Sequence, residues 1–323
     1  MKAIRVHTPG GPEALKYEDV PDPTPGAGQA VVKLGACGVN YIDVYFRTGQ
    51  YKAPLPLTVG HEGAGTVTAV GPGVADIKAG DRVAWTGVPA SYAEMNVVPA
   101  DRLVKLSDGL SFKDGAAAML QGMTAHYLAA STYPLKKGDV CLVHAAAGGV
   151  GLLLCQMARM RGATVIGTVS TDAKAAVARS VGVDHVILYT KQDFESEVKR
   201  ITAGAGVHVV YDGVGASTFD KGLNCLRPRG LMALFGQASG PVPPLDLQVL
   251  NARGSLFVTR PSLNHHIAGR DELRERAGDV LGWIRDGKLK LRLEHQFPLA
   301  DAAEAHRALE GRRTTGKILL IPT

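Results

Sequence analysis

A glycine-rich turn in the middle of the chain has the residue types that bind a phosphate group. Residues 139–144 form an apolar, strand-like run that leads into the small residues 145–151 and then into an apolar helical segment. In the order strand, turn, helix, such a turn lets the backbone approach a pyrophosphate, and the helix N-terminus supplies free N–H donors. The pattern is incomplete, because Ala146 holds the place of the first glycine, and a tight structural turn is the alternative. The predicted cofactor contacts in this turn are Ala147, Gly148, Gly149 and Val150.

The end of the next apolar run bears on which nicotinamide cofactor would bind. A site for NAD usually has Asp or Glu at this strand end to hold the ribose 2′-hydroxyl. Here Ser170 follows the run 163–169, and Lys174 comes four residues later. A hydroxyl and an ammonium can hold a 2′-phosphate, so the pattern predicts NADPH. Asp172 is evidence against NADPH, because an acid here could instead favour NAD. Ser170 could also cap the following helix rather than bind a phosphate.

A second group of polar and aromatic residues lies nearer the N-terminus. Asn40 is a polar residue in a small, apolar stretch, and Tyr45, Arg47 and Tyr51 follow closely. An amide could hydrogen-bond the carbonyl of an electron acceptor, and aromatic rings could flank a flat substrate. We predict that these four residues are catalytic. The alternatives are an amide that satisfies a buried backbone group at Asn40 and ordinary packing for the others.

Two kinds of secondary-structure pattern follow one another along the chain, and the elements they predict must position these residues. Residues 1 to about 115 are β-rich, with strands expected near 2–7, 28–37, 64–70, 81–85 and 91–98. Apolar strand-like runs then alternate with helical segments, which predicts a parallel, doubly wound sheet of six strands. The six runs are 139–144, 163–169, 184–188, 207–212, 230–235 and 254–259, and the helical segments are 149–161, 172–181, 191–203 and 216–225.

The last part of the chain predicts a return to the first domain. Helices are expected near 270–286 and 300–310, and a strand near 317–321 closes the chain. We therefore expect an α/β protein in which a substrate domain, 1–117 with 261–323, contains an inserted cofactor domain, 118–260.

Composition excludes several other classes of protein. The chain has a net charge of +6, but its basic residues are scattered, so a nucleic-acid interface is not favoured. The four cysteines form no C-x-x-C pair, and no apolar signal core or membrane-length stretch is present. We expect a cytoplasmic protein without a membrane partner.

Five short segments together resemble a known family. The chain is similar to the zinc-independent quinone oxidoreductases, the zeta-crystallin-like branch of the medium-chain dehydrogenase/reductase superfamily. The resemblance covers nearly the whole chain, and it implies a GroES-like substrate domain and a Rossmann cofactor domain. The segments that carry it are 38–43, 60–65, 121–125, 145–151 and 311–317.

The resemblance implies that no metal takes part. Zinc-dependent relatives have Cys where this chain has Asn40, use the histidine at the position of His61, and have a further ligand near Gln121. Only the histidine remains of the three protein ligands that a catalytic zinc requires. His61 is then expected to be a hydrogen-bonded leftover, with a role in proton transfer as the alternative.

The resemblance also implies a set of cofactor contacts. In similar proteins Asn40 faces the nicotinamide, and Tyr189 lies with Ser170 and Lys174 near the adenine ribose. The remaining positions are mostly strand ends, which line the ligand crevice of a doubly wound sheet; small residues there could instead only make turns. They are Gln121, Thr124, Val214, Gly215, Phe235, Gly236, Gln237, Phe257, Thr259 and Arg312.

These observations predict an enzyme that uses NADPH to reduce a quinone or a related conjugated carbonyl. One alternative is a reductase of alkenes, enones or enoyl thioesters. Another, of a different class, is an NADPH sensor or nucleic-acid binder without significant catalysis. The apolar run 255–258 predicts an open sheet edge, and the family resemblance implies that two chains pair along it as a homodimer.

Overall fold

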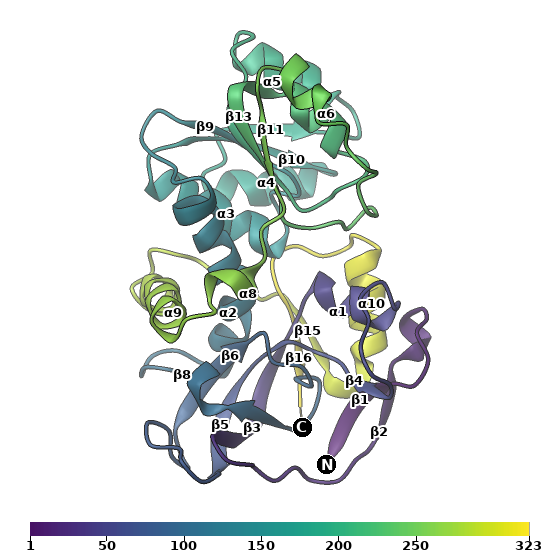
Figure 1. Cartoon of the computed structure of the whole chain (residues 1–323), viewed down its shortest axis with the longest axis vertical. Coiled ribbons are helices and arrows are strands. Elements are labelled where there is room, and N and C mark those ends of the chain that lie inside the picture. The colour runs from purple at the N-terminus through teal and green to yellow at the C-terminus, as the bar shows by residue number, and fades with distance from the viewer. Residues whose placement is uncertain (323) are drawn as a thin grey trace. The chain divides into compact units, whose positions relative to one another are not determined.

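The chain folds into two compact units. The computed structural model describes residues 1–322. The first unit is Met1–Met123 together with Ile267–Thr323, and the second is Thr124–His266 (Figure 1). Both ends of the chain therefore belong to the first unit, and the second unit is an insertion into it.

The first unit is built on a seven-stranded sheet in which β7 (Met95–Pro99) pairs with β3 beside the main strand order. The other six strands, in spatial order, are β15 (His295–Pro298), β16 (Ile318–Ile321), β3 (Gln29–Val39), β5 (Glu62–Val70), β6 (Arg82–Thr86) and β8 (Val104–Lys105). A smaller sheet contains β2 (Lys16–Asp19), β1 (Lys2–Val6) and β4 (Leu57–Thr58).

The C-terminal strand pairs with the middle of this sheet. β16 runs antiparallel to β3, with Ile318 opposite Val39 and Leu319 opposite Gly38. This pairing confirms the predicted return of the closing strand to the first domain. It also places the residue before β16 near the end of β3, although more than half of the chain separates them in sequence.

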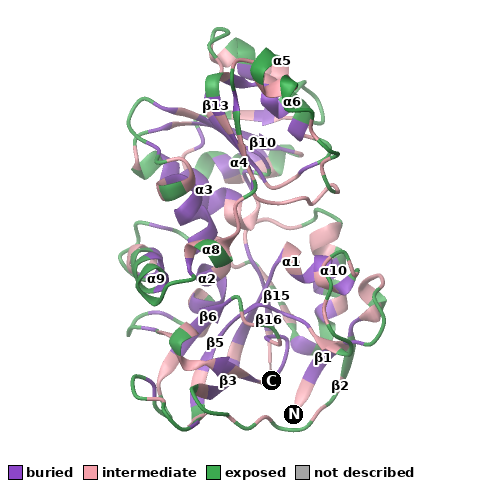
Figure 2. Ribbon diagram, viewed as in Figure 1, coloured by how far each residue is buried: buried purple, intermediate pink, exposed green. Residues whose placement is uncertain are grey.

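The helices α1 (Tyr41–Arg47), α9 (Arg270–Arg285) and α10 (Ala302–Glu310) lie entirely within the first unit. α9 and α10 were predicted from the sequence, whereas α1 was not. The core beneath them contains Val32, Trp85, Tyr92 and Leu320, all fully buried. Figure 2 shows the contrast between the buried strands and the exposed outer side of α9.

The second unit is a six-stranded parallel sheet, as predicted. Its spatial order places the first three strands in reverse and the last three in sequence, the order typical of dinucleotide-binding folds. The strands in that order are β11 (His185–Leu188), β10 (Thr164–Val169), β9 (Val140–Val143), β12 (Val207–Asp212), β13 (Leu226–Leu234) and β14 (Phe257–Thr259).

Crossover helices connect these strands. The longest is α3 (Gly149–Met160), in which residues 151–158 are buried because both faces of a parallel sheet must be covered. The other helices of this unit are α4 (Asp172–Ser180), α5 (Phe194–Ile201), α6 (Phe219–Asn224), α7 (Gln248–Ala252) and α8 (Leu263–His266).

One continuous helix carries the chain from the first unit into the second. α2 (Phe112–Tyr127) contains the boundary after Met123, and the second boundary follows His266. Both lie a few residues beyond the predicted domain limits of 118 and 260. A boundary inside a helix leaves no Gly-, Pro- or Ser-rich linker in the sequence to mark it.

No helix among residues 1–322 combines the length and the apolar character that crossing a bilayer would require.

Candidate active site

Asn40 lies where β3 ends and α1 begins. Its backbone is extended, with φ −138° and ψ 156°, and it serves as the N-cap of α1. The backbone N–H of Asn40 donates to the Asp43 carboxylate over 2.9 Å, and the N–H of Asp43 donates back to the Asn40 carbonyl over 3.0 Å. This short helix therefore holds two polar side chains at one strand end, although a seven-residue helix has little stability of its own.

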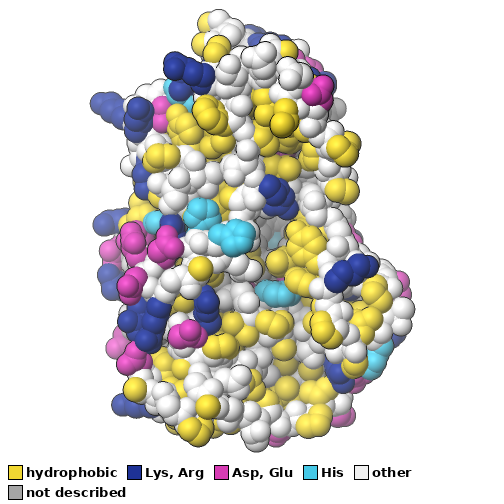
Figure 3. All heavy atoms as spheres, in the orientation of Figure 1, with side chains coloured by type: hydrophobic (Ala, Val, Ile, Leu, Met, Phe, Trp, Pro, Cys, Tyr) yellow, Lys and Arg dark blue, Asp and Glu magenta, His cyan; other side chains and the backbone are white. Residues whose placement is uncertain are grey.

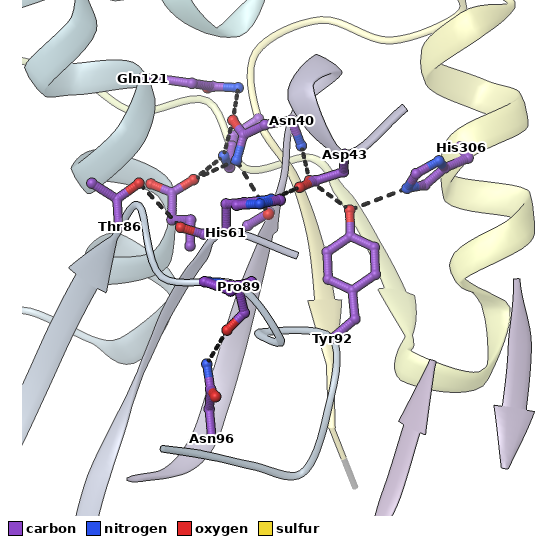
Figure 4. Close-up of polar contacts among 12 residues, drawn as sticks. Asn40, Asp43, His61, Thr86, Pro89, Tyr92, Asn96, Gln121 and His306 are labelled. Atoms are coloured by element: carbon purple, nitrogen blue, oxygen red, sulfur yellow. Dashed lines mark hydrogen bonds and ion pairs between the residues drawn. The ribbon is translucent and has the colours of Figure 1, made fainter. Parts of the chain in front are cut away.

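The Asn40 side chain makes four hydrogen bonds (Figure 4). Its Nδ2 donates to the Gly38 carbonyl at 3.2 Å and to Glu62 at 2.8 Å. Its Oδ1 accepts from Gln121 at 3.1 Å and from Lys317 at 2.9 Å. An amide has two donor hydrogens and two acceptor lone pairs, so this side chain is saturated. Contact with an acceptor carbonyl would require it to give up one of these bonds.

A buried ion pair between Glu62 and Lys317 lies at the centre of this network. Both side chains are almost completely buried, and Lys317 Nζ lies 2.5 Å from Glu62 Oε2. The backbone N–H of Leu120, in α2, donates to the other Glu62 oxygen at 2.6 Å. Burial lowers the pKa of Lys317 from its usual value, and the charge of Glu62 opposes that shift. Together with Asn40 and Gln121 the pair forms a cluster that we call the amide–ion-pair cluster.

Three neighbouring strands assemble this cluster. Asn40 follows β3, Glu62 begins β5, and Lys317 precedes β16, and β3 lies between the other two strands in the sheet. Gly38 provides the room, because a Cβ at that position would lie 2.3 Å from Glu62 Oε2.

A second set of polar side chains is centred on the fully buried Asp43 (Figure 4). Asp43 Oδ1 lies 2.8 Å from His61 Nδ1, and Asp43 Oδ2 accepts from the Tyr92 hydroxyl at 2.9 Å. The same hydroxyl lies 3.1 Å from His306 Nε2. Burial lowers the pKa of His306 to about 4, and burial is also the main cause that raises the pKa of Tyr92.

Aromatic rings from α1 and the loop that follows it pack around this set. Phe46 stacks on the His61 ring with centroids 4.7 Å apart and an interplanar angle of 20°. Tyr51 contacts both Phe46 and Tyr45, with ring centroids 5.5 and 5.2 Å apart. The structure thus brings Tyr45 and Tyr51 together close to His61, within the first unit.

Arg47, which was predicted to be catalytic, has a buried guanidinium. Its guanidinium is 1% exposed and makes two hydrogen bonds to Glu310, at 2.7 and 2.8 Å. It also donates to the Gly10 carbonyl and lies 3.1 Å from His306 Nδ1. The structure therefore uses Arg47 to connect α1 with α10, which argues against the predicted catalytic role.

In the second unit, the glycine-rich turn connects β9 to α3. Gly148 is the N-cap of α3 and has no side chain that could cap the first N–H groups. A Cβ at Gly151 would lie 2.3 Å from the Ala145 carbonyl oxygen and 2.9 Å from Ala146 Cα, so glycine is required there. Ala147 is buried, whereas Gly148, Gly149 and Val150 are partly exposed. The turn has the geometry of an anion-binding helix terminus.

The neighbouring strand ends carry the residues predicted to contact the adenine ribose. Thr171, not Ser170, caps α4, since its hydroxyl accepts from the Lys174 N–H at 3.2 Å. This result removes the capping alternative for Ser170. Asp172, the acid that could favour NAD, is paired with Lys191 at 2.8 Å. The hydrogen bond to Lys191 is the main cause that lowers the pKa of Asp172.

The last strands of the sheet bring further predicted residues to the same edge. Asp212 ends β12, is fully buried, and accepts from the N–H groups of Val214 and Gly215 at 2.7 and 3.0 Å. A Cβ at Gly236 would lie 2.5 Å from the Gly213 carbonyl, which shows how closely the loops after β12 and β13 approach. The other predicted residues of this unit that are at least partly exposed are Tyr189, Phe235, Gln237, Phe257 and Thr259.

Three predicted cofactor residues do not belong to the strand ends of the second unit. Thr124 is a buried residue of α2. Arg312 belongs to the first unit, follows α10, and adopts a left-handed backbone with φ +54°. Gln121 also belongs to the first unit, where its amide is part of the amide–ion-pair cluster.

The donor set of the first unit does not fit a catalytic metal. Within residues 1–322, no group of three or more His, Cys, Asp and Glu side chains could hold a metal ion. Where zinc ligands would be needed, the chain has the amides of Asn40 and Gln121, and the Lys317 ammonium lies 2.9 Å from the Asn40 oxygen. The Lys317 ammonium therefore occupies the place that a metal ion bound to the Asn40 oxygen would need.

Sequence reasoning missed Asp43, Glu62, Tyr92, His306 and Lys317 as site residues. Glu62 and Asp43 left a signal, since each is a charged residue within a small, apolar segment. The other three carried no local signal, because their partners are distant in sequence.

The fold and the two polar sets define a protein with a GroES-like unit and a dinucleotide-binding Rossmann unit. The Alcohol dehydrogenase GroES-like domain family matches residues 26–108, and the Zinc-binding dehydrogenase family matches residues 149–282. The chain belongs to the quinone oxidoreductase branch of the medium-chain dehydrogenase/reductase superfamily, because near-full-length relatives with that name share more than 40% identity with it.

Individual relatives show how close this similarity is. The chain is 44% identical to a quinone oxidoreductase of Pseudomonas aeruginosa, with 99% of each chain covered. It is also 44% identical to a 2-haloacrylate reductase of a Burkholderia species, with 100% of this chain and 99% of the relative covered. The structure of Escherichia coli quinone oxidoreductase complexed with NADPH is 43% identical over 100% of both chains and superposes with a TM-score of 0.98.

Proposed function

We propose that this protein is an NADPH-dependent enzyme that reduces quinones without a metal. The proposal rests on one combination of features. The second unit has a dinucleotide-type turn, and the first unit has the amide–ion-pair cluster where a metal centre would otherwise lie. The full-length similarity to quinone oxidoreductases supports the acceptor class.

The residues of the second unit fit a nicotinamide dinucleotide. The uncapped N–H groups at the start of α3 suit the pyrophosphate, and the required glycine at 151 lets α3 pack closely against the turn. Ser170 and Lys174 have the chemistry to hold a 2′-phosphate. When bound, the cofactor supplies the hydride, and the protein supplies binding, orientation and electrostatics.

The residues of the first unit would act on the acceptor. Tyr45 and Tyr51 offer aromatic surface for a flat ring. Asn40 is fully hydrogen-bonded, so we assign it the task of holding Lys317 and Glu62 in place rather than that of donating to the acceptor. Replacing Asn40 with Ala is then expected to lower turnover and stability together, with little change in NADPH affinity.

The decisive experiment measures NADPH oxidation by the purified protein with a panel of quinones, enones and aldehydes. Turnover with quinones at a kcat/KM well above that with enones supports the proposal. NADPH binding without turnover on any acceptor would instead support a sensor without catalysis. Figure 3 gives nucleic-acid binding little support, since acidic side chains are interspersed with the basic ones on the face drawn.

A second candidate function is reduction of a conjugated alkene. It is favoured by the 2-haloacrylate reductase, which is as similar in sequence as the quinone oxidoreductases. The same panel separates the two, because an enone or a haloacrylate would then be the better substrate.

The Asp172–Lys191 pair offers a test of cofactor choice. With Lys191 present, the acid at the end of β10 is neutralised and does not repel a 2′-phosphate. The variant Lys191→Ala is expected to lose more affinity for NADPH than for NADH. Adding Asp172→Asn to it should restore part of that preference, and equal Kd values for the two cofactors in the wild type would contradict NADPH as the cofactor.

We also propose that the protein is a cytoplasmic homodimer. All four cysteines are buried free thiols, which suits a reducing compartment. Support for the dimer comes from β14, which ends the second unit's sheet and exposes 60% of Phe257.

A further inference from the structure

His61 is held in one orientation by two independent contacts. Its Nδ1 lies 2.8 Å from Asp43 Oδ1, and its ring face stacks on Phe46. Asp43 in turn is fixed through its other oxygen by the Asn40 N–H and the Tyr92 hydroxyl. A carboxylate at Nδ1 accepts a hydrogen there and leaves the second ring nitrogen to exchange a proton.

That second nitrogen, Nε2, has no hydrogen-bond partner in the described part of the chain. Among residues 1–322, no group hydrogen-bonds His61 Nε2, and the atom is not among the buried polar atoms that lack a partner. The His61 residue retains 8% exposure. A histidine that merely filled space would not require a fully buried carboxylate with three donors on it, because burying that charge is costly.

The other ionisable groups of the two polar sets are less suited to proton transfer. Asp43, Glu62, Tyr92 and His306 are fully buried, and Lys317 is 2% exposed and bound to Glu62 and Asn40. The Tyr92 hydroxyl already donates to Asp43. His61 is therefore the member of these sets that combines a titratable atom with an open edge.

We propose that His61 is the proton donor of the reduction and that Asp43 is its positioning residue. The inference rests on the second candidate function, the reduction of a conjugated alkene by NADPH, and applies to conjugated carbonyl acceptors. An alkene that receives hydride at its β carbon shifts its π electron pair toward the carbonyl and becomes an enolate. The Nε2–H of protonated His61 then gives its proton to the enolate, and the neutral ring regains a proton from water at its exposed edge.

This step conserves charge and atoms. One hydride and one proton add to the acceptor, the cofactor is oxidised by two electrons, and water replaces the proton on His61. The charge in contact with the ring is the Asp43 carboxylate from α1, and Glu62, which follows His61 in sequence, is paired with Lys317. A hydroquinone anion is a much weaker base than an enolate, so quinone reduction needs this donor less.

The test compares His61→Ala and His61→Gln with the wild type. For an enone acceptor, turnover should fall by about 100-fold, in the range that general acid catalysis contributes. Loss with a quinone should be much smaller, and the Kd for NADPH should not change. Added imidazole should restore enone turnover in His61→Ala, at a rate that follows the concentration of imidazolium. His7→Ala, at an exposed histidine, is the control and should behave like the wild type.

Asp43→Asn tests the positioning residue through a different readout. Nitrogen NMR of the His61 ring should show the hydrogen on Nδ1 in the wild type at high pH and its loss from that position in the variant. Tyr92→Phe keeps the carboxylate and should preserve the ring tautomer.

Enone turnover within twofold of the wild type in His61→Gln, or no rescue of His61→Ala by imidazole, overturns the proposal. Either result leaves the proposed function intact if the wild type still reduces acceptors with NADPH. Absence of turnover in the wild type would instead remove the proposed function itself.

Discussion

At the residue scale, the site depends on a few buried charges whose partners are distant in sequence. Glu62 and Lys317 form an ion pair that is shielded from water on all sides and is completed by amides. Burying such a pair is expensive, and the cost of breaking it by removing one partner is larger still. The Asp43 set has the same character, with a buried carboxylate surrounded by donors.

Replacing Lys317 with Met should therefore be strongly destabilising. It leaves the Glu62 charge buried without its cation, so the free energy of unfolding should fall by about 3–5 kcal/mol. Urea unfolding measures this loss, and the double variant Lys317→Met with Glu62→Gln should recover part of it. Lys221→Ala, which breaks an exposed pair with Asp193, is the matched control and should cost less than about 1 kcal/mol. Similar losses in the two single variants would contradict a special role for burial.

His306 should make stability depend on pH. Burial lowers its pKa to about 4 in the folded protein, while in the unfolded chain the imidazole has its ordinary pKa of 6.5. The contribution is fully present above pH 6.5 and is lost as pH falls toward 4, a change of about 3 kcal/mol. Unfolding free energies of wild type and His306→Gln, measured between pH 7 and 4, should differ in slope, with the variant flatter. Parallel curves would show that His306 is not the responsible group.

At the element scale, the phosphate turn depends on the contact of α3 with the strand before it. The absence of a side chain at Gly151 allows this contact, since a Cβ there would lie 2.3 Å from the Ala145 carbonyl. α1 shows the same principle at the other site, where a helix of seven residues is stabilised by its packing and by the contacts of its first residues.

The variant Gly151→Ala should destabilise the second unit and weaken NADPH binding, because backbone atoms must shift to admit the methyl group. Isothermal titration and thermal unfolding measure the two effects. Gly278→Ala in α9 is the control, since nothing lies within 4 Å of its Cβ position. There, higher helix propensity should add about 0.5–1 kcal/mol of stability. An unchanged melting temperature and NADPH affinity in Gly151→Ala would contradict the close contact.

At the scale of the whole molecule, the second unit presents an open sheet edge. β14 pairs with β13 on one side, and Phe257 on it is 60% exposed. An exposed edge with a large apolar residue favours pairing with another chain. We expect light scattering to give the mass of a dimer for the wild type, and Phe257→Lys to shift it toward a monomer with little loss of fold by circular dichroism. A monomeric wild type would rule the dimer out.

Much of the fold could be predicted because its signals are local. The six strands of the second unit are short apolar runs, and β16 was recognisable as an apolar end to the chain. α1 escaped prediction because seven residues are too few to show a helical period. The boundary after Met123 lies inside α2, so no linker in the sequence marks it.

The candidate site, too, was predictable only where its sequence signals are local. The phosphate turn is a continuous stretch of sequence, and Gly148 and Gly151 lie in it as predicted. Arg47 was predicted to be catalytic together with Tyr45 and Tyr51, and the sequence could not show its partner Glu310, which lies near the other end of the chain. His61 was expected to be a hydrogen-bonded leftover, but the sequence could not show that Asp43 is its partner or that Phe46 stacks on its ring.

The sequence by itself determined the class of fold, the location of the dinucleotide turn and the family. Each of these depends on residue types at short and regular spacing, which set backbone conformation and burial directly. Only the tertiary structure decided what the polar residues of the first unit do. The pairing of β3 with its neighbours brings Asn40 and Glu62 into contact with Lys317. The fold also brings Asp43 within hydrogen-bond distance of His61. Hydrogen bonds and ion pairs act over about 3 Å in space, whatever the separation along the chain, and sheet pairing is what makes that distance short.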